Sequence, residues 1–262
     1  MAAAAGVLAF HSNAAARTQQ GCPAGFVPAR IAGSFQCLEE GASCKRKLDR
    51  AYHRYYFHCH RGYLTFGWNF LRRPFHVSSL APGTPCPTSS RTGTLNFGIP
   101  GLPAWGPGPA YPTSLGDGPT PIFSYFDRLD PAGVYGTEWG GQKALWLIGS
   151  GSYAHMLIRG RQLDGPNQLR FEDGVPAFTS EEALHPSPEL QILFGGDHPA
   201  VTRIRAPGCY AYQVDGLRFS YDIVFEARSL GPEPGASSSK RSREAIASAS
   251  LRVASRAARD GS

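Results

Sequence analysis

The chain has 262 residues, a formal net charge of +6, 42% hydrophobic residues and 18% charged residues. This balance excludes a largely disordered chain and allows a sizeable core in one medium domain or two small ones. The 31 glycines and 22 prolines make up about a fifth of the chain, above the roughly 12% of average usage, so short strands and turns are expected rather than long helices.

An apolar, alanine-rich leader begins the chain. The run from Ala2 to Phe10 is far shorter than the ~18 residues that a membrane span needs, and the small residues at 14–16 are typical of a secretory cleavage site. The positively charged segment that usually begins a signal is missing, so a leader without export function is the alternative. We interpret residues 1–21 as a signal-peptide-like leader, expect a secreted or cell-envelope protein, and find no transmembrane segment.

Six cysteines agree with an oxidising compartment; they are Cys22, Cys37, Cys44, Cys59, Cys86 and Cys209. Six cysteines allow 15 pairings, of which we prefer 22–37, 44–59 and 86–209, since the first two intervals are equal. A closed loop of ~15 residues stabilises a fold by roughly 3 kcal/mol, and a segment this small has too little core to fold without such links. The sequence therefore predicts a cysteine-rich module over residues 22–63.

Within this module, residues 28–41 suggest a strand and a turn at Glu40-Gly41, and residues 44–59 suggest a helical turn that runs into a strand. At the other end of the chain, residues 229–262 are mostly small and polar, with six basic and three acidic residues. A helix in this tail would have a thin apolar face and be marginal by itself. We therefore expect a disordered basic tail.

Short apolar runs separated by turn signals occupy residues 64–228. The expected strands lie at 93–98, 121–127, 143–149, 154–163, 168–172, 189–194, 200–206, 209–215 and 218–227. Asp164-Gly165 and Asp215-Gly216 predict type I′ hairpin turns. A spacing of roughly ten residues favours an immunoglobulin-like antiparallel β-sandwich, in which a tyrosine bonds back to the backbone. Tyr210 and Tyr212 are the candidates for this role, next to a disulfide-bonded Cys209.

The fold class is thus mainly β, with a disulfide-rich module before the sandwich. The stretches CPAGFVPARIAGSFQCLEEGASCKRKLDRAYHRYYFHCHRG, LAPGTPCP, WGGQKALWLI and APGCYAYQVDG resemble those of uncharacterised secreted bacterial proteins with this organisation. The resemblance covers most of the chain from Cys22 to Ala227. It implies an exported β-rich fold and carries over no catalytic residue.

The histidines of the segment YHRYYFHCHRG are the candidate metal ligands. On a strand, His58 and His60 share a face, and with His53 nearby they could meet a zinc ion. The usual zinc spacings are absent, and an oxidised Cys59 cannot be a thiolate ligand. We prefer a disulfide-anchored aromatic strand with surface imidazoles, and we expect no cofactor.

Basic and aromatic residues alternate over residues 44–76. Eight lysines or arginines and two acids lie between Glu40 and His76, a composition that can bind nucleic acid or another anionic polymer by charge and stacking. Export makes an acidic polysaccharide the better partner than nucleic acid. The alternative is a solvated basic face over aromatics that form a small core.

Catalytic signals are weak. Ser150, Ser152 and His155 do not form a G-x-S-x-G motif, and Asp164 and Asp215 are explained as turn residues. Glu172 and Asp173 are the remaining acid and base candidates, and the cysteines are nucleophiles only if reduced.

A binding role is therefore expected over catalysis, with polysaccharide or another surface polymer as the ligand. Its candidate contact residues are Trp105, Tyr111, Trp139, Arg54, Tyr56 and Arg61, whereas Trp146 is expected in the core. The alternatives are a hydrolase or metal-dependent enzyme whose site is assembled from distant loops, and a nucleic-acid or anionic-polymer binder through residues 44–76. The ligand and the oligomeric state stay open.

Overall fold

The computed structural model describes residues 21–23, 25–96, 100–127, 139–149, 155–173, 186–193 and 195–231. Apart from Gly21 and residues 229–231, the leader and the basic tail lie outside the described residues, as do Ser150 and Ser152. The chain is mainly β. No helix in the described ranges is long and apolar enough to cross a membrane.

All three expected disulfides are present. Cys22 is bonded to Cys37 and Cys44 to Cys59, each across 15 positions. The third bond joins Cys86 to Cys209 across 123 positions. The equal spacing of the first four cysteines thus indicated their pairing correctly.

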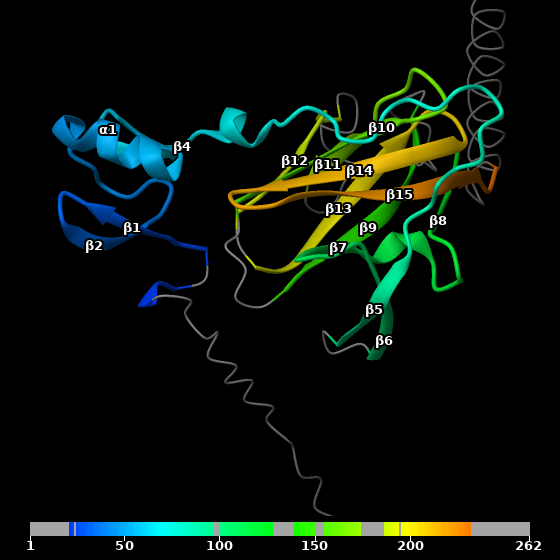
Figure 1. The fold of residues 1–262 in the computed structure, drawn as a ribbon, viewed down its shortest axis with the longest axis horizontal. Helices are drawn as coiled ribbons and strands as arrows, with labels where there is room; N and C mark the ends of the chain where they lie inside the picture. The colour runs from blue at the N-terminus through cyan, green and yellow to red at the C-terminus, as the bar shows by residue number, and fades with distance from the viewer. Residues whose placement is uncertain are drawn as a thin grey trace, which may run out of the picture.

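The N-terminal module consists of two hairpins and a short helical segment (Figure 1). Strands β1 (Val27–Ile31) and β2 (Ser34–Leu38) form one hairpin through the turn Ala32-Gly33. The expected turn at Glu40-Gly41 follows β2, where the Ala42 N–H donates to the Glu39 carbonyl at 3.2 Å. The single turn of α1 (Asp49–Tyr52) lies between 3₁₀ turns η2 (Arg46–Leu48) and η3 (His53–Tyr55). Strands β3 (Phe57–His60) and β4 (Tyr63–Phe66) form the second hairpin, so the expected helical turn that runs into a strand is confirmed.

The boundary that we expected at Tyr63 lies inside the second hairpin. A further 3₁₀ turn, η4 (Trp68–Leu71), follows β4, and Leu71 is buried in the same apolar cluster as Phe57 and Leu64. We therefore use "N-terminal module" for residues 22–71. Leu157 of the larger part belongs to this cluster too, so the module packs against the sheets rather than standing apart.

Two sheets share one core in the larger part. The first has the order β12 (Leu190–Ile192), β10 (Met156–Gln162), β14 (Gly208–Gly216), β15 (Ser220–Ser229) and β8 (Ile122–Tyr125). The second has the order β11 (Arg170–Asp173), β13 (Gly196–Ile204), β9 (Gly140–Ile148) and β7 (Ala110–Pro112). All nine expected strands overlap a strand of the structure.

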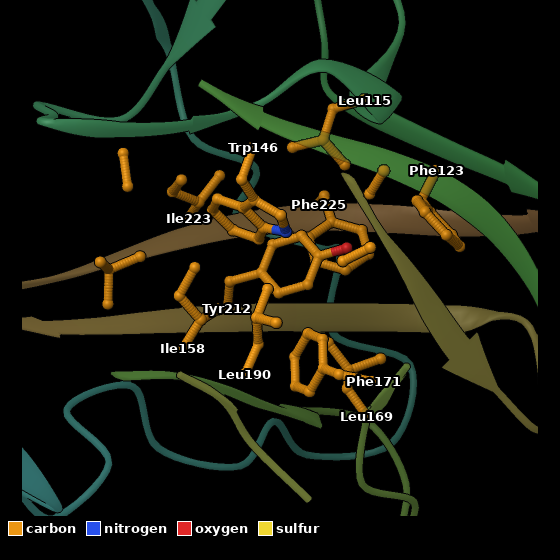
Figure 2. Packing of buried hydrophobic residues seen from close by; sticks show 14 of the residues in the cluster. Leu115, Phe123, Trp146, Ile158, Leu169, Phe171, Leu190, Tyr212, Ile223 and Phe225 are labelled. Carbon is orange, nitrogen blue, oxygen red and sulfur yellow. The ribbon is translucent and has the colours of Figure 1, made fainter. Parts of the chain in front are cut away.

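The core lies between these two sheets. Trp146 of β9 and Tyr212 of β14 point toward each other across it, with ring centroids 5.0 Å apart (Figure 2). Phe225 of β15 stacks on Tyr212 at 4.6 Å. Trp146 is fully buried, as its apolar strand predicted.

We expected wholly antiparallel strand pairing, but the structure also contains a parallel pair. Strand β8 runs parallel to β15 along the edge of the first sheet. Two further strands, β7 and β6 (Pro100–Trp105), were not expected because prolines interrupt them. Both are at edges, since β7 ends its sheet and, in the part of the chain that the structure describes, β6 pairs with β5 (Arg91–Asn96) alone. A missing backbone N–H is tolerated at an edge.

The expected type I′ turns are at other positions. Neither residue of Asp164-Gly165 or Asp215-Gly216 has a positive φ, whereas Ala32-Gly33 and Arg61-Gly62 have positive φ at both central positions. Asp164 is an exposed loop residue whose carboxylate accepts the Cys209 N–H at 3.0 Å. Asp215 is fully buried within β14, so its description as a turn residue is wrong.

Segment 72–89 connects the module to β5 and crosses the outer face of the first sheet. The Val77 carbonyl accepts a hydrogen bond from Arg161, and the Leu80 N–H donates to the Leu163 carbonyl at 2.6 Å. The Cys86–Cys209 bond then fixes the segment to β14. This cover explains why the outer face of the sheet contains buried polar residues.

Candidate functional site

The second hairpin of the module presents an aromatic and histidine-rich face to solvent. Tyr56 has φ +67°, a left-handed conformation that ends the helical segment and directs the chain into β3. Alternation in β3 then buries Phe57 and Cys59 and directs His58 and His60 outward. The turn Arg61-Gly62 leads back into β4, where Tyr63 pairs with His60.

Two large aromatic side chains remain in solvent, one on this hairpin and one on the η4 turn that follows it. Tyr63 is 60% exposed and Phe70 is 51% exposed. Phe70 lies over the His58 ring, with centroids 5.7 Å apart, and beside Tyr56 at 5.8 Å. The hairpin has a separate buried side that supplies the module's core, so these exposed rings are not needed for packing.

Two basic side chains of the same segment are also exposed. Arg61 occupies the hairpin turn and Arg54 lies in the preceding 3₁₀ turn, and both are exposed. We use the name "aromatic basic face" for Arg54, His60, Arg61, Tyr63 and Phe70. Three of the predicted contact residues, Arg54, Tyr56 and Arg61, therefore lie on or beside this face, and Tyr56 is half-buried.

The other predicted aromatic contacts are less accessible. Trp105 is fully buried, and its Nε1–H donates to the Gly116 carbonyl at 3.2 Å. Trp139 is 8% exposed, with the Arg205 guanidinium 4.1 Å from its ring centroid. Our expectation that these tryptophans are surface residues was wrong, because Trp105 packs into the main core cluster and the Arg205 guanidinium lies over the Trp139 ring. Tyr111 is half-buried and packs near Leu147.

Two of the three predicted histidine ligands come together, with a partner that we had not considered. His53 Nε2 lies 3.0 Å from Asp49 Oδ2 and 2.9 Å from His58 Nδ1. The three possible ligand atoms of Asp49, His53 and His58 all lie within 4.8 Å of one another. His60 is not a member of this group. The helical spacing of Asp49 and His53, four residues apart, was the signal in the sequence.

The catalytic candidates from the sequence are engaged in structural contacts. Glu172 forms a buried ion pair with Arg203 of β13, and Asp215 forms one with Arg159 of β10 at 2.7 Å. His155 is buried among aromatic rings of the module, those of Phe57, Phe66 and Trp68. The side chain of Asp173 lies outside the described residues.

A hydrogen-bonded chain that the sequence analysis missed lies where segment 72–89 meets the sheet. His76 Nδ1 lies 3.0 Å from Asp222 Oδ2, and His76 Nε2 lies 3.0 Å from Ser220 Oγ. Ser220 Oγ also donates a hydrogen bond to Asp215. Burial is the main cause that raises the pKa of Asp222, and His76 opposes this shift. The one signal in the sequence for this hydrogen-bonded chain was the alternation of polar residues in β15, which places Ser220 and Asp222 on the same face of the strand.

Comparisons with known proteins assign no family to these sites. No protein-family model matches the chain, and no curated protein is significantly similar to it.

Proposed function

We propose that the protein is an exported, non-catalytic binding module that recognises an acidic surface polysaccharide through the aromatic basic face. The observation that carries this proposal is the exposure of Tyr63 and Phe70, at 60% and 51%, beside the exposed Arg54 and Arg61. Aromatic rings supply most of the contact energy where they are buried by a partner, and their apolar faces stack on the apolar faces of sugar rings.

The charge of the module supports an anionic ligand. Eight basic residues and two acids lie between Glu40 and His76, and Lys45, Arg46 and Lys47 are exposed as well. A positively charged surface attracts a negatively charged polymer over about a Debye length, roughly 8 Å at physiological ionic strength. Binding should therefore weaken steeply as salt is added.

The compartment supports a polysaccharide over a nucleic acid. Three disulfides, with no free cysteine among the described residues, suggest an oxidising, extracellular environment. Secretion and membership of the secreted bacterial proteins that the sequence resembles are part of the proposal. Cell-surface polymers with carboxylate or sulfate groups are the anionic ligands abundant there.

We include an immunoglobulin-like topology in the proposal. Tyr210 donates a hydrogen bond to the Ala206 carbonyl at 2.9 Å, which matches the tyrosine corner of such sandwiches, and Trp146 lies in the core between the sheets. Two features depart from the common pattern: the parallel pairing of β8 with β15, and a disulfide that ties segment 72–89 to β14 rather than one sheet to the other.

The test is binding of the full chain to immobilised polysaccharides at low and high salt. Alginate and heparin serve as the carboxylated and sulfated probes, and dextran as the neutral one. We expect retention on the acidic probes, none on dextran, and at least a tenfold loss of affinity in Tyr63→Ala and Phe70→Ala. Each base stacked on an aromatic ring contributes about 1–3 kcal/mol in the comparable case of single-stranded nucleic acids.

Phe35→Ala is the matched control, since Phe35 is 50% exposed on the other hairpin of the module. It should bind like the wild type. Retention that survives both Tyr63→Ala and Phe70→Ala, or that falls equally in Phe35→Ala, contradicts the proposed face. Tighter binding of single-stranded DNA than of either acidic polysaccharide would favour the nucleic-acid alternative.

A second candidate function, serine-type hydrolysis, is favoured by the Ser220–His76–Asp222 chain. Its order matches a catalytic triad, with the carboxylate on Nδ1 and the hydroxyl on Nε2. The Ser220 proton, however, is directed to Asp215, so His76 Nε2 is the donor in this arrangement. Hydrolysis requires that the hydroxyl proton turn toward His76 instead.

Labelling with a fluorophosphonate distinguishes the two candidates. A hydrolase should be modified at Ser220, and His76→Ala should abolish the modification. For a binding module, in which this chain holds segment 72–89 on the sheet, Ser220 should stay unlabelled while the wild type still binds the acidic polysaccharides.

A further inference from the structure

Asp49, His53 and His58 place three metal-ligand atoms around one point beside the aromatic basic face. His53 Nε2 is 3.0 Å from Asp49 Oδ2 and 2.9 Å from His58 Nδ1, and all three atoms lie within 4.8 Å of one another. A tetrahedral zinc ion with bonds of about 2.0–2.1 Å separates its ligand atoms by roughly 3.3 Å. The atoms are thus close to the spacing that a single metal ion requires, without a change of backbone.

Hydrogen bonds among Asp49, His53 and His58 cannot satisfy all three of the facing nitrogen and oxygen atoms. An imidazole nitrogen carries either one proton or one lone pair in the plane of its ring, whereas His53 Nε2 faces two partners. If Nε2 is protonated and donates to Asp49, it has no lone pair to accept a hydrogen bond from His58 Nδ1. If it is unprotonated and accepts from His58, its lone pair also faces the negatively charged Asp49 carboxylate, which repels it. A cation at the centre would satisfy all three lone pairs together.

The surrounding structure holds each ligand in place. The other carboxylate oxygen of Asp49, Oδ1, accepts the Cys59 N–H at 2.5 Å, which leaves Oδ2 free to face His53. The His58 ring is stacked under Phe70, and a Cβ on Gly67 would lie 3.1 Å from its Nε2, so the ring is confined between them with Nδ1 toward the group. The Cys44–Cys59 disulfide anchors the strand that carries His58.

We propose that Asp49, His53 and His58 bind a divalent late transition-metal ion, with Zn²⁺ as the representative. Two imidazoles and one carboxylate suit ions such as Zn²⁺, Ni²⁺ and Cu²⁺ rather than Mg²⁺ or Ca²⁺, which prefer oxygen ligands. The His53 and Asp49 side chains are 43% and 35% exposed, so a fourth coordination position is open to solvent. This site does not rest on the proposed polysaccharide binding, because none of its three ligands belongs to the aromatic basic face, although Phe70 of that face packs on the His58 ring.

The test is isothermal titration of the untagged, chelator-treated full chain with ZnCl₂, together with the absorption spectrum of the Co²⁺ form. We expect one equivalent bound, tetrahedral d–d bands with Co²⁺, and no binding of Mg²⁺. Loss of an outer partner of a metal ligand costs about 10–100-fold in affinity, so His53→Ala and His58→Ala should weaken binding by at least about 100-fold. Asp49→Asn keeps an oxygen for the Cys59 N–H and should also weaken it.

His60→Ala is the matched control, since His60 is an exposed histidine of the same strand outside the group. It should bind Zn²⁺ like the wild type. In the wild type, NMR should show Zn²⁺-dependent shifts of the His53 and His58 rings and none of His60, a result that needs no variant to fold. Absence of a stoichiometric site, or an equal loss of affinity in His60→Ala, would overturn the proposal.

Discussion

His155 is a neutral imidazole buried where the N-terminal module meets the first sheet. Its ring stacks on Phe66 with centroids 3.9 Å apart and lies 5.6 Å from the Phe57 ring. It is 2% exposed, and neither ring nitrogen has a hydrogen-bond partner among the described residues. Burial disfavours the charged form and lowers the pKa of His155 from 6.5 to about 4.

The pH dependence of stability should report this histidine. Between pH 6.5 and about pH 4 the unfolded chain binds a proton at His155 that the folded chain excludes, so the free energy of unfolding falls as the pH falls through this window. The loss approaches about 3 kcal/mol near pH 4, at about 1.4 kcal/mol for each pKa unit. Urea unfolding at pH 7.5 and pH 4.5 measures it.

His155→Phe is the informative variant, because it keeps a ring in the aromatic cluster and removes the titrating group. We expect it to lose this part of the pH dependence and to be at least as stable as the wild type at pH 7.5, since two buried unsatisfied nitrogens are removed. An identical pH slope in the wild type and in His155→Phe would show that His155 does not control acid stability.

At the scale of elements, the two hairpins of the module depend on left-handed turn residues. Ala32-Gly33 and Arg61-Gly62 have φ values of 50° and 84°, and of 50° and 89°. Such type I′ turns match the twist of the strands they join. Asp-Gly pairs favour such turns in the sequence, but strand pairing and the buried Arg159–Asp215 ion pair override that local preference at Asp215.

Gly33→Ala should destabilise the module by about 1–2 kcal/mol. A Cβ at this position meets no atom within 4 Å, so the cost is the left-handed backbone conformation alone. Gly93→Ala is the control, because a Cβ there also meets open space but the backbone φ is not left-handed. Chemical unfolding of both variants measures the difference. Equal stabilities would contradict the role assigned to this turn.

Elements were predictable from the sequence where local physics sets them. Apolar and aromatic runs bounded by turn residues identified nine strands, since strand pairing uses the same alternation that the sequence displays. Proline-containing β6 and β7 were missed, because only their positions at sheet edges make prolines acceptable. The parallel pairing of β8 could not be predicted from the sequence, because its partner β15 lies about a hundred positions away.

Sites were predictable only where their residues are neighbours in the chain. The histidine segment led to His53 and His58 directly, and Asp49 was accessible through its helical spacing. Exposure of Trp105 and Trp139 was misjudged, because their glycine- and proline-rich surroundings resemble loops, whereas Trp105 packs into the core between the sheets and Arg205 lies over Trp139. The chain from His76 to Ser220 and Asp222 joins residues about 145 positions apart, and no local pattern shows such a contact.

At the scale of the whole molecule, the Cys86–Cys209 disulfide holds segment 72–89 on the first sheet. It closes a loop of 123 positions, which the chain-entropy model relates to about 5 kcal/mol of stability, against about 3 kcal/mol for each 15-residue loop. The double variant Cys86→Ala/Cys209→Ala should therefore lose more free energy of unfolding than Cys22→Ala/Cys37→Ala. Guanidinium unfolding ranks the two.

Limited proteolysis adds a local readout for the same pair of variants. Cleavage within residues 77–89 should rise in Cys86→Ala/Cys209→Ala only, because the covalent link to β14 is lost. Hydrogen bonds between Val77 and Arg161, between Leu80 and Leu163 and between Ser89 and Val224 then hold the segment. Equal unfolding free energies with unchanged cleavage would mean that packing, and not the disulfide, holds the segment.

The most direct test of the account is hydrogen-exchange footprinting of the full chain with and without an acidic polysaccharide such as alginate. Recognition through the aromatic basic face predicts protection confined to residues 53–72, which contain η3, the second hairpin and η4, and loss of that protection in Tyr63→Ala. Protection centred on the two-sheet part with none on the second hairpin, or no protection at saturating polysaccharide, would contradict recognition through the aromatic basic face.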